Sequence, residues 1–114
     1  YVENNKNLTN AEKVLKKAVS MDEKNPYYLD SLGSLYLKMN NLTLAQKYFI
    51  DALKHNPNEP VILYHYSKAL KQMRNEMEAA KTLGKARTII LDMLIYSIES
   101  DSELKSIEQT ISKK

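Results

Sequence analysis

The residues best suited to acid–base chemistry or metal binding are the two histidines, His55 and His65. They lie ten positions apart in segments that we assign below to different helices, and no third ligand or nucleophile follows at a known spacing. The sequence has no glycine-rich phosphate loop and no cysteine, which excludes a thiolate zinc site and a cysteine nucleophile. We therefore predict that the chain is not an enzyme and that it binds no metal or cofactor.

Charge is distributed unevenly, which raises the question of nucleic-acid binding. From Lys38 to Arg87 there are nine basic and four acidic residues, whereas residues 88–114 contain three basic and five acidic ones. A basic surface attracts phosphates. The lysines are divided between successive predicted helices, however, and form no single stripe with interleaved aromatic residues. We predict an ordinary solvated surface and no nucleic-acid partner.

Length and composition favour a single helical domain. The chain has 114 residues with only two glycines and three prolines, too few for the many turns of a β-sandwich or barrel. No apolar run reaches the roughly 18 residues of a membrane span, and the longest, residues 89–98, contains Asp92. Because the chain begins with Tyr1, we expect it to be a segment of a longer protein, whose compartment the sequence does not indicate.

An internal repeat of 34 residues organises the chain. The triplet Asn7-Leu8-Thr9 recurs as Asn41-Leu42-Thr43, and four columns keep this spacing over three copies. The columns are Asn7, Asn41 and Asn75; Ala11, Ala45 and Ala79; Leu15, Phe49 and Leu83; and Ala18, Ala52 and Ala86. A fixed period of this length is typical of helical repeat arrays, in which each unit packs against its neighbours.

Each unit is predicted to contain two short antiparallel helices. Apolar residues recur at helical spacing on both sides of Asn40-Asn41, at Leu29, Leu32, Tyr36 and Met39 before it and at Ala45, Phe49 and Ala52 after it. Asn40 can end one helix in the left-handed conformation, and Asn41 can cap the next. Pro26 and Pro60 suit the first turn of a helix. We predict helices at residues 1–5, 8–21, 26–39, 42–55, 60–73, 76–99 and 101–112.

Residues 26–59 resemble a tetratricopeptide repeat (TPR). The first helix contains Leu32-Gly33-Ser34-Leu35-Tyr36, and the second contains Ala45, Phe49 and Ala52 before the closing Pro57, whereas Leu29 replaces the family's aromatic residue. Residues 60–91 match less completely, with Ser67 in place of the glycine and Leu70 in place of the tyrosine. The resemblance covers about residues 1–91 and implies an all-α, right-handed helical solenoid of antiparallel helix pairs.

We accordingly divide the chain into four parts. Residues 1–25 are the end of a truncated repeat, mainly its second helix; 26–59 are a complete TPR; 60–91 are a second, degenerate TPR; and 92–114 are a helix extension and a C-terminal capping helix. Ser100 to Glu103 has the Ser-x-x-Glu form of a capping box. Leu104, Ile107 and Ile111 line one face of the helix that follows, so we expect residues 101–112 to cover the end of the solenoid.

Two alternatives remain for this C-terminal region. Residues 89–98 could stay exposed and form a dimer seam. A membrane-surface helix is disfavoured, because the neighbouring polar residues are acidic rather than basic.

The TPR resemblance also implies a function, since the first helices of TPR units line a concave groove that holds a peptide or a partner helix. The family's groove positions are Tyr27, Asp30, Ser34, Leu37 and Lys38 in the complete unit, and Val61, Tyr64, His65, Lys68 and Lys71 in the next. Tyrosines beside lysines suit a ligand with apolar and acidic groups. Asp30 and Ser34 replace the Lys and Asn of the carboxylate clamp in chaperone-tail-binding members, which disfavours that subclass.

Two function classes follow from these patterns. The first is a protein–protein interaction module that binds a protein or peptide partner of unknown identity, which predicts a monomer with a free groove. The alternative is a structural self-assembly module that forms a homodimer through its ends.

Overall fold

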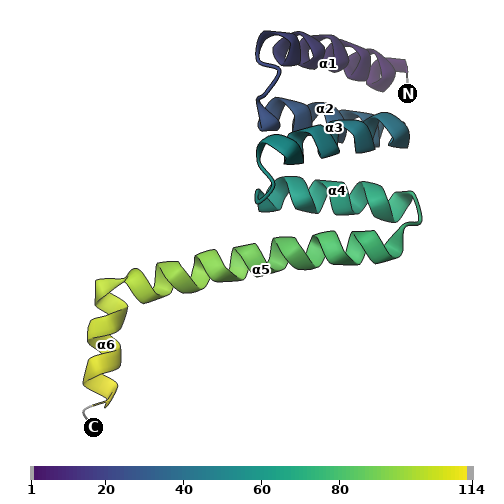
Figure 1. Ribbon diagram of the computed structural model, residues 1–114. Helices are drawn as coiled ribbons and strands as arrows, with labels where there is room; N and C mark the ends of the chain where they lie inside the picture. Colours follow the sequence, from purple (N-terminus) through teal and green to yellow (C-terminus); the bar gives the residue numbers. More distant parts are fainter. Residues whose placement is uncertain (1, 113–114) are drawn as a thin grey trace.

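The chain is an all-α helical solenoid in a computed structural model that describes residues 2–112, with side chains for residues 7–112. Over this range the helices are α1 (Val2–Met21), α2 (Pro26–Lys38), α3 (Leu42–His55), α4 (Pro60–Gln72), α5 (Glu76–Ser100) and α6 (Ser102–Ser112). Figure 1 shows α1 to α5 stacked in successive layers, with α5 running beyond the stack and α6 turning away from its end. From α2 onward, each helix bound lies within one residue of the sequence prediction.

The turn inside each unit is built from the residues that the repeat indicates. Asn40 adopts a left-handed conformation with φ of 59°, and Oδ1 of Asn41 accepts a hydrogen bond from the backbone N–H three residues later at 3.3 Å. One repeat later, Arg74 has φ of 62°, and Oδ1 of Asn75 makes the same capping bond at 3.4 Å. Both units therefore reverse direction in the same way, with a left-handed residue followed by an Asn cap.

The first helix corrects one expectation, because α1 is continuous where we predicted a break between residues 5 and 8. The reversal at Asn41 is held by a backbone bond from its N–H to the carbonyl of Tyr36 at 2.8 Å and by the packing of α2 on α3. Among the described helices α1 packs only against α2, so none of them packs behind Asn7 to support a reversal there. Nothing therefore favours a reversal at Asn7, and the helix continues through it.

The core lies between α2, α3 and α4 around the ring of Phe49, which is fully buried. Ala45 and Ala69 are also fully buried and let the helices approach this ring. A Cβ atom added to Gly33 would lie only 2.9 Å from Cε1 of Phe49. The small residues of the repeat pattern thus create the space that the aromatic side chain fills.

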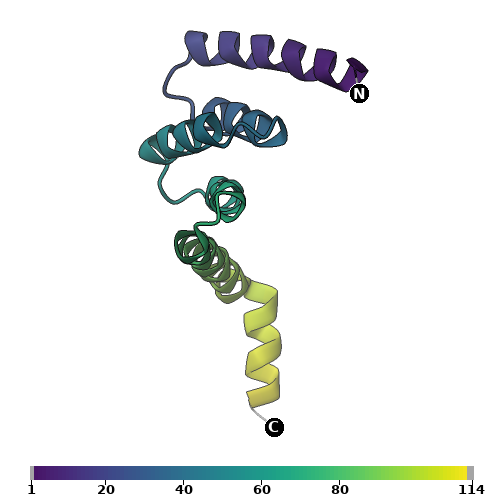
Figure 2. The ribbon, with the colours of Figure 1, turned by 90° about the vertical axis from the view of Figure 1, so that its right-hand side faces the viewer.

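The second half of α5 projects from the stack, and we call residues 87–100 the arm (Figures 1 and 2). The Cα radius of gyration is 19.0 Å, against about 13 Å for a compact domain of this length. Apolar side chains are exposed along the arm, with Met93 at 61%. Although α5 is the longest helix, neither it nor any other in residues 2–112 combines the length and apolarity needed to cross a membrane.

α6 forms where predicted, but the expectation that it covers residues 89–98 is wrong for a single chain. It packs against no described helix other than α5, and it buries none of its own residues. Asp101 is the only residue between the two helices, and its Oδ1 caps α6 by accepting from the N–H of Leu104 at 2.9 Å. A one-residue connection cannot return α6 along α5. Ser100 still belongs to α5 and donates to the carbonyl of Tyr96, so Asp101 replaces Ser100 as the cap.

Candidate functional site

A groove of about 560 Å³ opens between α2 and α4, the first helices of the two units. Six of the ten predicted site residues line it, namely Asp30, Ser34, Leu37, Lys38, His65 and Lys68. Leu15 of α1, Ser31, Leu35 and Gln72 complete the lining. Residues one repeat apart meet here because stacked units place equivalent helices side by side.

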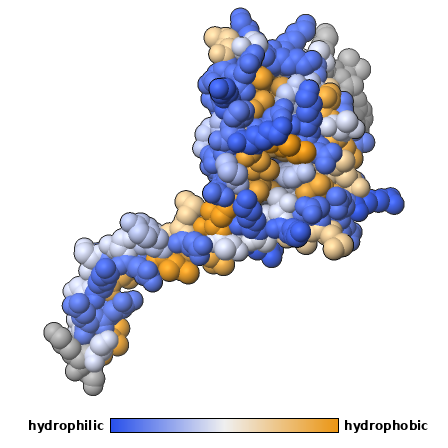
Figure 3. Space-filling model, viewed as in Figure 1, coloured by the Kyte–Doolittle hydropathy of each residue, from blue (hydrophilic) through white to orange (hydrophobic). Residues whose placement is uncertain are grey.

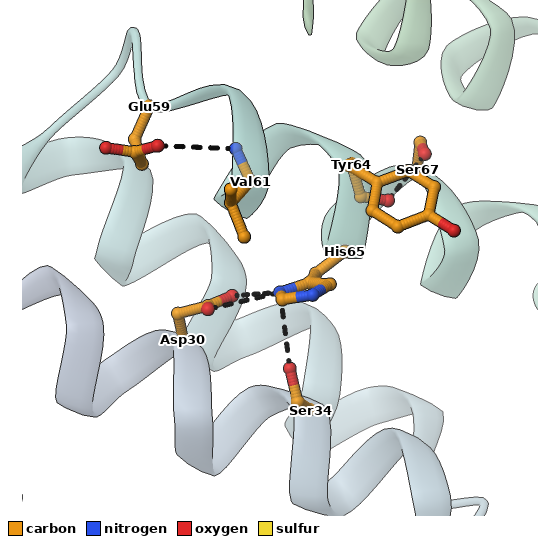
Figure 4. Close-up of polar contacts among 7 residues, drawn as sticks. All are labelled: Asp30, Ser34, Glu59, Val61, Tyr64, His65 and Ser67. Carbon is orange, nitrogen blue, oxygen red and sulfur yellow. Dashed lines mark hydrogen bonds and ion pairs between the residues drawn. The ribbon is translucent and has the colours of Figure 1, made fainter.

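A polar bridge joins the two units inside the groove. Nδ1 of His65 lies 2.9 Å from Oδ1 and 3.1 Å from Oδ2 of Asp30, and 3.5 Å from Oγ of Ser34 (Figure 4). Asp30 is only 8% exposed, and burial raises the pKa of its carboxyl, while the hydrogen bond with His65 partly opposes this rise. The bridge fixes α4 against α2 and places a titratable pair on the groove wall.

The groove has an acidic end and a basic end, because α2 and α4 run in the same direction. At their N-terminal ends, the phenol of Tyr27 donates to Oε2 of Glu59 at 3.2 Å, and this bond is the main cause of the raised pKa of Tyr27. Asp30 lies on the same side of the groove. Toward the C-terminal ends, the lining includes Lys38 and Lys68. A bound carboxylate is therefore favoured at the lysine end.

The other four predicted site residues lie outside the lining of this groove. Tyr27 lies at the N-terminal end of α2, and Val61 is exposed beside Glu59, whose Oε1 accepts from its N–H at 3.4 Å. Tyr64 and Lys71 line a second hollow of about 590 Å³ between α4 and α5. Figure 4 shows His65 pointing toward α2 while Tyr64 lies on another side of α4.

Lys68 lies at the boundary between the groove and this second hollow, since it lines both. Its Nζ lies 5.3 Å from the centroid of the Tyr64 ring, a cation–π distance. We predicted tyrosines beside lysines within one continuous groove. Tyr64 and Lys68 do lie together, but Tyr64 lines the hollow on the α5 side and not the groove between α2 and α4.

Sequence reasoning missed four of the residues that line the groove, Leu15, Ser31, Leu35 and Gln72. Gln72 lies 34 residues after Lys38, so the repeat period could have identified it. The pairing of Asp30 with His65 was not foreseen, although both were assigned to the groove. Within the described residues, no three His, Cys, Asp or Glu side chains gather in a way that could hold a metal ion.

Comparison with known families identifies the repeat type. Residues 4–86, which are 83 of the 114, match the family described as "Anaphase-promoting complex, cyclosome, subunit 3". The chain belongs to this family. Its repeats are of the TPR type, in agreement with the resemblance found in residues 26–59. No curated protein sequence matches this chain.

Two solved TPR-like structures share the fold of this family member. A structure described as "MamA MSR-1 C2" has a TM-score of 0.70 and 22% identity over 76% of this chain and 50% of that one, so the chain spans half the length of MamA. The translocator chaperone SycD of Yersinia enterocolitica, described as an alternative dimer, has a TM-score of 0.69 and 20% identity over 97% of this chain and 78% of that one. These likenesses establish the TPR-type solenoid.

Proposed function

We propose that this chain is a protein–protein interaction module that binds a peptide or a partner helix in the groove between α2 and α4. The observation that carries the proposal is the convergence of side chains from α1, α2 and α4 on one open groove of about 560 Å³. Concave sites that combine apolar walls with a few converging polar groups are the usual form of ligand sites.

The comparisons support a role in holding other proteins. The family is described by a subunit of a multiprotein complex, and SycD is described as a chaperone of translocators. Both descriptions concern proteins that associate with other proteins. The structural likenesses are below 25% identity, so they do not identify the partner of this chain. We infer the class of partner from the chemistry of the groove lining instead.

The groove lining defines the class of ligand. Leu15, Leu35 and Leu37 provide apolar surface, and Lys38 and Lys68 provide positive charge at one end. Asp30 would repel a carboxylate placed near the other end, where Glu59 also lies. The ligand is therefore a peptide segment with apolar side chains and with its acidic residues directed toward Lys38 and Lys68.

The test begins with selecting binding peptides from a displayed random library on the 114-residue chain. Fluorescence anisotropy then gives Kd for the wild type, for Lys38→Glu in the groove, and for Lys47→Glu as a control. Lys47 lies on α3 with its Nζ 5.5 Å from the centroid of the Tyr48 ring and does not line the groove. Lys38→Glu should weaken binding about tenfold at low salt and reduce its salt dependence, while the control changes Kd less than about twofold.

Two outcomes would contradict the groove. One is an equal loss of affinity in Lys47→Glu and Lys38→Glu. The other is a set of amide chemical-shift changes, on adding the selected peptide, that maps to the outward faces of α3 and α5 and leaves Asp30, Ser34 and His65 unchanged.

A further inference from the structure

The 34-residue repeat reveals an unfilled packing position at the C-terminal end of the stack. In the first complete unit, α4 packs on the surface that α2 and α3 form together: Ile62 joins Leu29 and Ala52, and Ala69 joins the cluster around Phe49. One repeat later, the corresponding surface of α4 and α5 is a hollow of about 590 Å³.

Six lining residues of the hollow lie one repeat after residues of the surface that α2 and α3 form. Tyr64 stands for Asp30, Ser67 for Gly33, Lys68 for Ser34, Lys71 for Leu37, Ala79 for Ala45, and Leu83 for Phe49. Against α2 and α3 this position is filled by a helix, whereas no other described helix packs on both α4 and α5. The expected occupant of the hollow is therefore a helix with an apolar stripe like that of α4.

α6 has such a stripe, and it is unused. Leu104, Ile107 and Ile111 are 39%, 56% and 67% exposed, and no residue of α6 is buried. Their spacing of three and seven residues equals that of Ile62, His65 and Ala69, three of the α4 residues that face α2 and α3. α6 has 11 residues and α4 has 13, so the two helices are also similar in length.

The charges of the two surfaces are complementary. Glu103 and Glu108 flank the apolar stripe of α6 at helical spacing. The hollow is lined by Lys68 and Lys71, with Glu76 as its one acidic lining residue. Charge complementarity of this kind fixes the orientation of a docked helix and speeds its association.

The α6 of the same chain cannot reach the hollow. The helical rise of 1.5 Å per residue places the start of α6 about 30 Å from Ala80, which lines the hollow. Asp101 alone connects α5 to α6, and α6 touches none of α1–α4. A copy of α6 that fills the hollow must therefore come from a second molecule.

We propose that two copies of this chain form a homodimer in which α6 of each copy packs into the hollow between α4 and α5 of the other. Two arms lying antiparallel bring the end of one α5 beside the beginning of the other, so a two-fold axis satisfies both contacts at once. Figure 3 shows apolar surface along the arm. The same arrangement covers exposed apolar residues of the arm, among them Leu91, Met93 and Leu94.

The first experiment measures mass by sedimentation equilibrium of the 114-residue chain. The wild type should have the mass of a dimer at tens of micromolar. Ile107→Glu should shift it to the monomer by placing a charge in the contact. Gln109→Glu, on the opposite side of α6 from the stripe, is the control and should remain a dimer. Circular dichroism confirms that both variants keep their helix content.

The second experiment locates the contact and uses the absence of cysteine from the sequence. Ala80→Cys and Ile107→Cys chains, mixed and oxidised, should form a disulfide-linked heterodimer. Ala80→Cys mixed with Gln109→Cys, on the opposite face of α6, should form at least about tenfold less. The proposal is overturned by a monomeric wild type at 100 micromolar, by a dimer that survives Ile107→Glu, or by equal cross-linking in the two mixtures. A dimer that dissociates in Ile107→Glu but gives no Ala80–Ile107 cross-link also overturns it, since the arms alone would then hold the copies together.

Discussion

His65 and Asp30 lie 35 residues apart in the sequence, yet Nδ1 of the histidine is 2.9 Å from Oδ1 of the aspartate. The repeat of 34 residues explains this proximity, because it places His65 one position after Tyr64, the equivalent of Asp30. The pair links α2 of one unit to α4 of the next. It also lies on the groove wall where we propose that a ligand binds.

Comparing the unfolding free energies of the wild type and Asp30→Asn should reveal the free-energy cost of burying the ionised carboxylate of Asp30. The pKa of Asp30 is raised above 3.8 in the folded chain, chiefly by burial, so the folded state holds its proton more tightly than the unfolded state. The stabilising contribution of Asp30 is therefore complete below pH 3.8 and is lost as the pH rises through the folded-state pKa. The stability of the wild type relative to Asp30→Asn should fall as the pH rises from about 3 to 6.

Urea unfolding at a series of pH values measures this difference. Asp51→Asn is the control, since Asp51 is a more exposed carboxylate that pairs with Lys54 at 3.8 Å. If the wild type instead gained stability over Asp30→Asn across this range, the interaction with His65 would outweigh the burial of Asp30.

Alanine substitution at the two glycines should change stability in opposite directions. At Gly33 an added Cβ would lie 2.9 Å from Cε1 and 3.0 Å from Cδ1 of Phe49, whose buried ring has no room to move. Gly33→Ala should therefore destabilise the chain by about 1–3 kcal/mol. At Gly84 an added Cβ meets nothing within 4 Å, so Gly84→Ala should stabilise α5 by about 0.5–1 kcal/mol. Chemical denaturation of both variants checks the pair, and a stabilising Gly33→Ala would contradict the close approach of α2 to α3.

A reciprocal exchange tests the turns within the two units. Asn40 and Arg74 both have positive φ, at 59° and 62°, and the left-handed region strains most side chains but is tolerated by asparagine. Arg74→Asn should raise the unfolding free energy by a few tenths to about 1 kcal/mol, and Asn40→Arg should lower it by a similar amount. Thermal unfolding measures both. Effects of the same sign in the two variants would show that backbone strain does not govern these positions.

The helix pairs could be predicted closely because local and long-range signals agree in them. Asn caps, prolines at the first turn, and the columns containing Ala45 and Phe49 all indicate the same boundaries between residues 26 and 86. The prediction failed at Asn7, where the cap residue is present but none of the described helices packs behind it. A cap sequence therefore marks a boundary here only when tertiary packing supports the reversal.

Six of the ten residues predicted for one groove line it, whereas the division of that surface into two hollows could not be predicted. The repeat period places Asp30, His65 and Lys68 on first helices, yet it does not give the rotation of α4 about its axis. That rotation turns His65 toward α2 and leaves Tyr64 on the α5 side, which separates one expected surface into two. The prediction that α6 covers the end of its own solenoid was wrong for a related reason. The sequence shows the apolar face of α6 but not the direction in which the helix leaves Asp101.

The stack places each helix mainly against its neighbours in sequence, and α1 packs only against α2 among the described helices. The free energy of local opening should therefore rise from both ends toward the middle instead of being shared by the whole chain. In a dilute monomeric sample, amide hydrogens of α6 and the arm should exchange with deuterium first, those of α1 next, and those of α2 to α4 around Phe49 last. The solenoid would thus unfold by losing its outer helices in sequence, with the complete unit as the last part to remain.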